Sequence, residues 1–242
     1  MRTEINTNID VINNRINSAC AASNRNIHDI TLVAVSKRKN NELIEFALDC
    51  GVKNFGENYA QEMKEKSETI NSDKIVWHFI GPIQTNKIKI IAQHAHWVHT
   101  LDREKVIKKL NSECESIDKI MNAFIQVNIS NEDTKNGCDP EDLIEIGKLV
   151  ESMRNINLKG LMALPRLNSD LVERKRAMSL VKELSLKLQS INNDANAISL
   201  GTTSDFEEAI AHGSTMLRIG ESIFGKRPVS YTHLTLPTKL AV

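Results

Sequence analysis

The feature that most constrains this chain is a regular alternation of short, β-branched apolar runs with longer segments of helical periodicity. Such runs are typical of buried parallel strands, and the longer segments are typical of amphipathic helices. Eight strands are expected, at residues 30–36, 53–56, 75–80, 97–101, 121–129, 158–164, 197–200 and 216–219. Helices are expected between them, and two starts are predicted from capping residues: Asp102 before one helix, and Asp139 followed by Pro140 before another.

Eight strand–helix units in about 200 residues predict a single (β/α)₈ barrel of the α/β class. The main alternative is an open doubly wound sheet, which usually has fewer strands at this length. An extra helix, with Ile9, Ile12 and Ile16 on one face, precedes the first strand. The barrel domain is expected to span residues 1–227. Residues 228–242 lack helical periodicity and are expected to be a disordered or non-native tail.

Composition argues against several classes of function. The 31 basic residues balance 31 acidic ones, so no net charge attracts nucleic acid or an anionic membrane. The four cysteines are widely spaced and the histidines match no zinc motif, so neither disulfides nor a metal site are expected. With no secretory or membrane-spanning apolar run, we expect a soluble cytoplasmic protein, either a monomer or a weak dimer.

The expected strand ends carry a distinct set of polar and small residues. In a parallel barrel the carboxyl ends of the strands meet at one face, where ligands bind. Lys37 follows the first strand beside apolar walls, where desolvation would lower its pKa and make its amine a nucleophile able to form a Schiff base. Taken alone, such a lysine more often simply extends into solvent. The other strand ends contribute Asn58, His78 with Gly81, Asn128, Met162, Gly201 with Thr203, and Arg218 with Gly220.

Two loops on the opposite side of the barrel are candidates for binding phosphate. Residues 199–204 (SLGTTS) follow the seventh strand, and residues 218–222 (RIGES) follow the eighth. Loops at these two places commonly bind phosphate at a helix N-terminus. The alternative is ordinary helix capping by Ser and Thr.

An amine on the first strand facing an anion-binding loop points to an aldehyde that carries a phosphate, and pyridoxal 5′-phosphate (PLP) fits that description. Arg218 would then lie near the pyridine nitrogen and keep it unprotonated, which weakens the electron sink. A surface salt bridge is the alternative role for Arg218. Arg218 and Thr203 are both expected at the mouth of the barrel rather than in the core.

Five segments together resemble the pyridoxal phosphate homeostasis proteins: LVAVSK at 32–37, FGENY at 55–59, WHFIGPIQTNK at 77–87, GLMA at 160–163 and GSTMLRIG at 213–220. The resemblance implies an alanine-racemase-like barrel that binds PLP covalently without established turnover. By this resemblance Lys37 is the Schiff-base lysine, Asn58 lies beside the cofactor, and Arg218 with Gly220 contacts the ring nitrogen and phosphate. The family usually has Gly-Met-Ser after the seventh strand, whereas this chain has Gly201-Thr202-Thr203.

We therefore expect a carrier that holds PLP as a lysine aldimine in intracellular PLP homeostasis, with PLP-dependent apo-enzymes as its partners and no catalytic residue. The alternative is an amino-acid racemase of the alanine type, which needs a second base. In those enzymes a tyrosine from a separate β-domain supplies that base, and we expect no such domain after residue 220. A lyase acting on phosphorylated sugars through Lys37 is compatible with the barrel alone.

Overall fold

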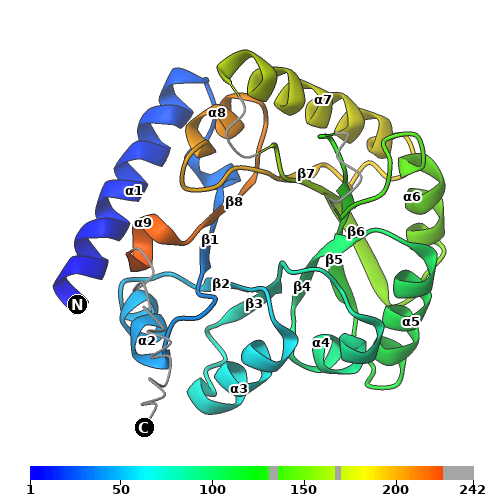
Figure 1. Cartoon of the computed structure of the whole chain (residues 1–242), viewed down its shortest axis with the longest axis horizontal. Coiled ribbons are helices and arrows are strands. Elements are labelled where there is room, and N and C mark those ends of the chain that lie inside the picture. Colours follow the sequence, from blue (N-terminus) through cyan, green and yellow to red (C-terminus); the bar gives the residue numbers. More distant parts are fainter. Residues whose placement is uncertain (131–135, 167–169, 226–242) are drawn as a thin grey trace, which may run out of the picture.

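The strands of this computed structural model close into one parallel barrel in chain order (Figure 1). The structure describes residues 1–130, 136–166 and 170–225, so the expected tail at 228–242 lies outside the described residues. The strands are β1 (Thr31–Val35), β2 (Asn54–Glu57), β3 (Val76–Phe79), β4 (Trp97–Leu101), β5 (Met121–Val127), β6 (Ile156–Ala163), β7 (Ala197–Ser199) and β8 (Met216–Ile219). Pairing of β1 with β8 completes the closure. The predicted (β/α)₈ barrel is confirmed.

Helices surround the strands as an outer ring (Figure 1). The predicted extra helix is α1, which packs against α2, α8 and α9. The helices are α1 (Arg2–Ala22), α2 (Asn41–Asp49), α3 (Ala60–Ile70), α4 (Ile88–His94), α5 (Glu104–Glu115), α6 (Leu143–Glu151), α7 (Leu171–Gln189), α8 (Phe206–Ala211) and α9 (Glu221–Phe224). Across the described ranges, none of them has the length and apolar character that a membrane crossing requires.

Two predicted helix starts are wrong. Helix α5 begins at Glu104, because the Asp102 carboxylate accepts a hydrogen bond from Arg103 Nη1 at 2.6 Å instead of capping the helix. Helix α6 begins at Leu143 rather than at Pro140. The Asp139 carbonyl accepts from the N–H of Asp142 at 3.0 Å, and this turn delays the helix by one turn.

The apolar core has two parts. The larger one fills the layer between strands and helices, and includes Ile44, Ile107 and Leu161. A small cluster of Val33, Phe124, Met162 and Met216 lies apart from it, on residues that alternate with outward-facing ones along their strands. Since this inner cluster has four buried apolar side chains among the described residues, much of the barrel interior is available to polar groups.

Gly160 marks a point where two strands approach closely. It has φ +148, and a Cβ there would lie 1.8 Å from the Ala197 carbonyl oxygen of β7. Gly51 also has a positive φ, +89, but a Cβ there would meet nothing within 4 Å. A side chain at Gly51 would therefore cause backbone strain alone, whereas a side chain at Gly160 would also clash with β7.

We expect Gly51→Ala to lower the free energy of unfolding by about 1–2 kcal/mol, the cost of a left-handed alanine. Gly160→Ala should cost more than about 4 kcal/mol, because β6 and β7 must also move apart. Urea unfolding of both variants measures this difference. Equal losses would contradict a steric role for Gly160.

Candidate functional site

The carboxyl ends of the strands surround a cavity of about 650 Å³. Six of the seven predicted site residues line it: Lys37, Asn58, Met162, Thr203, Arg218 and Gly220. They come from five different strand ends, so barrel closure alone brings them together. Their convergence makes this cavity the candidate site.

Gly201 does not line this cavity. It has φ +96, and a Cβ there would lie 2.7 Å from the Ala209 Cβ of α8. Its carbonyl accepts from the N–H of Arg218 at 3.0 Å. Gly201 thus supports the loop after β7, and only Gly fits without displacing α8.

Thr202, which lines the cavity where the family usually has Met, is bound within its own loop. Its N–H and its hydroxyl donate to Asp205 Oδ1 at 2.6 and 2.8 Å. Its polar group therefore stabilises the loop. Thr203 and Ser204 line the same wall, beside Thr202.

The helices beside these loops are too short for a strong helix dipole. Helix α8 has six residues and α9 has four. The prediction of phosphate binding at these loops therefore depends on the free N–H groups of the first helical turns rather than on the dipole of a long helix. Anion binding here would depend on the loop hydroxyls, on nearby backbone N–H groups and on cationic side chains.

The strand end that carries Lys37 is held by a buried ion pair. Lys66 of α3 donates to the Ser36 carbonyl and to Glu57 Oε1, each at 2.7 Å. The Ser36 hydroxyl donates to the same Glu57 oxygen at 2.6 Å. Burial raises the pKa of Glu57 to about 7, although Lys66 opposes that rise. These contacts fix the backbone immediately before Lys37, whose side chain is partly buried at the cavity wall.

The two residues after Lys37 are also held in place. The N–H of Arg38, at φ 59, donates to Glu62 Oε1 at 2.5 Å. The Lys39 amine donates to the carbonyls of Phe224 and Gly225, at 3.0 Å each. Lys39 also lines the cavity, but its amine ties the loop after β1 to α9.

Asn58 presents an amide oxygen that lacks a partner in the described part of the chain. Its Oδ1 is buried and accepts no hydrogen bond from those residues. Since more than nine-tenths of buried polar groups in proteins are bonded, such an atom on a cavity wall fits a ligand that donates a hydrogen bond.

Arg218 is buried rather than placed at the mouth, so that expectation is wrong. It is 5% exposed. Its two terminal nitrogens donate to Ser199 Oγ and to the Ala163 carbonyl. Burial lowers the pKa of Arg218 to about 10, with Asp205 acting in the opposite direction, so the guanidinium stays charged at neutral pH. The side chain still borders the cavity.

His78 is a hydrogen-bonded core histidine. Its Nδ1 lies 3.0 Å from His99 Nε2, and its Nε2 lies 3.0 Å from Asn54 Oδ1. Both rings are fully buried. Burial lowers the pKa of His78 to about 3 and that of His99 well below 6.5. Within the described residues, no group of three His, Cys, Asp or Glu side chains could hold a metal ion.

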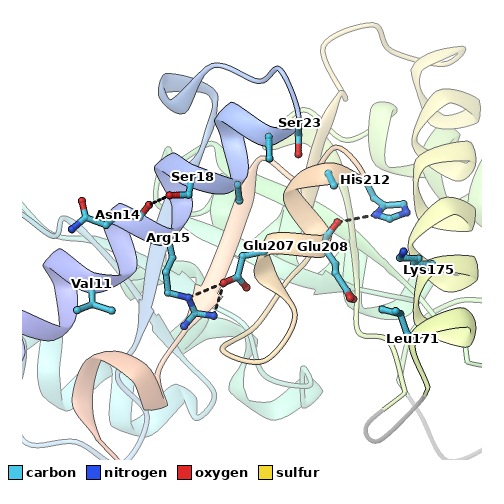
Figure 2. Close-up of a pocket in the computed structure, with 13 residues that line it drawn as sticks. Val11, Asn14, Arg15, Ser18, Ser23, Leu171, Lys175, Glu207, Glu208 and His212 are labelled. Carbon is cyan, nitrogen blue, oxygen red and sulfur yellow. Dashed lines mark hydrogen bonds and ion pairs between the residues drawn. The ribbon is translucent and has the colours of Figure 1, made fainter.

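A larger groove of about 980 Å³ lies on the outside of the barrel (Figure 2). Every residue that lines it belongs to α1, α7, α8 or the position directly after α1 or α8. Arg15 Nε donates to Glu207 Oε1 at 2.7 Å across the groove, and His212 Nδ1 bonds the Glu208 carbonyl. With no strand end in its walls, this groove lacks the arrangement that makes the barrel cavity a candidate site.

Comparison with known proteins assigns the family. The family described as "Alanine racemase, N-terminal domain" matches residues 8–228. A protein of Haemophilus influenzae named pyridoxal phosphate homeostasis protein is 40% identical over 230 residues, covering 93% of this chain and 97% of its own length. The protein of that name from Escherichia coli K12 is 36% identical, covering 94% and 98%. The chain belongs to the pyridoxal phosphate homeostasis protein family.

Solved structures agree with this family assignment. An unknown protein from Bifidobacterium adolescentis superposes with a TM-score of 0.88 at 27% identity, covering 92% of this chain and 95% of that chain. PipY of Synechococcus elongatus with PLP bound has a TM-score of 0.76 at 26% identity, covering 81% and 93%. Alanine racemase of Corynebacterium glutamicum, at 13% identity and a TM-score of 0.70, shares the fold.

Sequence reasoning missed the supporting residues of this family member. Ser36, Glu57, Lys66 and His99 were assigned no role, although each is buried and bonded close to the cavity, and Ser199 was expected in a phosphate-binding loop rather than as a partner of Arg218. Glu57 lies in the quoted FGENY segment, and its position at a buried strand end was a usable signal. Lys66 gave no such signal, because its partner Glu57 comes from another element.

We expect Lys66→Met to lower the free energy of unfolding by about 3–5 kcal/mol, since it leaves Glu57 buried without its cation. The double variant Glu57→Gln/Lys66→Met removes both charges and should recover most of that loss. Urea unfolding at pH 7 compares the two. A double variant no more stable than Lys66→Met would contradict this account of the pair.

His78 makes stability depend on pH. The unfolded chain binds a proton on this ring near pH 6.5 and the folded chain only near pH 3, so the stability is fully present above about pH 6.5 and is lost as the pH falls toward 3. From pH 7 to pH 5, His78 should account for a loss of about 2 kcal/mol. Urea unfolding at both pH values should show a smaller loss in His78→Gln. The same loss in that variant would argue against a neutral His78.

Proposed function

We propose that this protein binds PLP covalently through Lys37 and serves as a carrier of the cofactor in intracellular PLP homeostasis. The observation that carries the proposal is the convergence in one cavity of Lys37, Asn58, Arg218 and the Thr203 loop. Relatives named pyridoxal phosphate homeostasis proteins, and the PipY structure with PLP bound, support the choice of ligand.

Each lining residue has a distinct part in this proposal. When bound, PLP supplies an aldehyde, which condenses with a lysine amine with the loss of one water. Lys37 offers that amine from a strand end held by Lys66 and Glu57. Thr203 and Gly220 supply a hydroxyl and a backbone N–H for the phosphate, and Met162 packs as an apolar wall.

Arg218 restricts the chemistry that bound PLP could support. A guanidinium gives up no proton at neutral pH, so it only donates hydrogen bonds, and a pyridine nitrogen beside it stays unprotonated. An unprotonated ring withdraws electrons weakly, in contrast to a ring paired with a carboxylate. This chemistry is compatible with holding the cofactor and disfavours reactions that need a strong electron sink.

The racemase alternative needs a second base opposite Lys37. Among the described residues, Tyr59 is the one tyrosine. It is half-exposed and lies against Arg38 rather than in the cavity wall. We further propose that the protein acts in the cytoplasm as a monomer or a weak dimer and delivers PLP to apo-enzymes.

Borohydride reduction of the purified, yellow protein should fix one PLP on Lys37, and peptide mass spectrometry locates it. Lys37→Ala should lose both the label and the visible absorbance, because its amine forms the bond. Lys39→Ala is the matched control and should keep the label and the absorbance, because the Lys39 amine bonds the carbonyls of Phe224 and Gly225. A label on Lys39, or no label on the wild type, would refute the proposal. Turnover of amino-acid enantiomers that depends on Lys37 would favour the racemase.

A further inference from the structure

A hydrogen-bonded chain of side chains runs through the barrel interior behind the cavity. Arg218 Nη1 donates to Ser199 Oγ, which lies 2.8 Å from His99 Nδ1. His99 Nε2 lies 3.0 Å from His78 Nδ1, and His78 Nε2 lies 3.0 Å from Asn54 Oδ1. The members come from β8, β7, β4, β3 and β2, and four of them are fully or almost fully buried.

One arrangement gives every proton of this chain an acceptor. Arg218 has only donors, so Ser199 Oγ accepts from it, and the hydroxyl proton is left for His99 Nδ1. A neutral His99 then carries its proton on Nε2 and donates to His78 Nδ1. His78 in turn carries its proton on Nε2 and donates to Asn54 Oδ1, which only accepts. All four bonds therefore point away from Arg218.

This direction stabilises the buried cation. Each neutral imidazole turns its unprotonated nitrogen toward Arg218 and its N–H away from it, so the ring dipoles are aligned favourably with the positive charge. The two groups that accept hydrogen bonds from the terminal nitrogens of Arg218, Ser199 Oγ and the Ala163 carbonyl, are likewise uncharged. The guanidinium charge is therefore held without being neutralised by a bonded carboxylate.

We infer that Ser199, His99, His78 and Asn54 form a positioning chain that fixes Arg218 as a donor-only cation at the base of the cavity. His99 is the central member, because it joins the hydroxyl that contacts Arg218 to the rest of the chain. Because a guanidinium only donates, a ligand atom held against a fixed Arg218 is a hydrogen-bond acceptor, and a protonated heteroaromatic nitrogen is excluded there. This inference extends the proposed function, in which PLP supplies that acceptor.

The first test needs no ligand. Nitrogen-15 NMR of the histidines in hydroxylamine-treated, cofactor-free protein should show His78 and His99 neutral, both with the proton on Nε2, from pH 5 to pH 8. Signals are assigned by their loss in His78→Gln and His99→Asn. A proton on Nδ1 of His99, or a charged ring at pH 7, would overturn the chain.

The second test uses two amides at one position. In His99→Asn the amide oxygen takes the place of Nδ1 and still accepts from Ser199, whereas in His99→Gln the amide reaches only toward His78. PLP affinity, from absorbance titration, should stay within about threefold of wild type for Asn and fall about tenfold for Gln, the effect of one hydrogen bond to a charged system. Melting temperatures should fall similarly, because both variants shrink the same buried side chain.

Equal PLP affinities of the Asn and Gln variants would overturn the role of His99. Wild-type protein that binds no PLP would instead refute the proposed function, while the NMR measurement would still test the chain by itself. The spectrum of bound PLP adds a readout that a merely structural role would not move. Its maximum should shift with pH in His99→Gln, because an Arg218 that is no longer fixed can move away and let the ring nitrogen take up a proton, and should stay constant in His99→Asn.

Discussion

Closure of the barrel between its first and last strands is the constraint on which the site depends. In that pairing Val33 lies beside Arg218 and Ala34 beside Ile219. The two strands approach so closely that a Cβ on Gly220 would lie 2.9 Å from the Val35 carbonyl oxygen. Residues at opposite ends of the chain thereby share one cavity wall, and Lys37 and Arg218 become neighbours of the same ligand-sized space.

The protein holds two buried cations near this cavity in different ways. Lys66 is surrounded by the carboxylates of Glu57 and Glu62, at 2.7 Å each, so its charge is balanced where it lies. Arg218 donates to a hydroxyl and a carbonyl instead. A cation bonded to carboxylates suits a group that fixes backbone, whereas a cation bonded to uncharged acceptors is better able to act on a ligand, although Asp205 also acts electrostatically on Arg218. We therefore infer that Lys66 fixes the backbone before Lys37, whereas Arg218 faces the ligand.

Much of the fold follows from patterns that are local in the sequence. Eight apolar runs alternating with helical segments leave few topologies, and strand β8 lies at 216–219 as predicted. The predicted helix starts at Asp102 and Asp139 were wrong because of local hydrogen bonds. Asp102 accepts from the Arg103 guanidinium, and the Asp139 carbonyl accepts from the N–H of Asp142 in a turn. Six of the seven site residues line the cavity, since strand ends can be read directly from the pattern. Gly201 lies outside it, because only packing against Ala209 reveals its part.

The sequence by itself determined the barrel, the face on which the strand ends meet and the place of Lys37 on that face. Those features depend on residue periodicity and on the parallel geometry of the strands. Only the tertiary structure decided which polar groups meet inside, such as Lys66 with Glu57 and Arg218 with the Ser199–His99–His78 chain. Hydrogen bonds between strands depend on register and on the depth of each side chain in the barrel, and no local pattern encodes these distances.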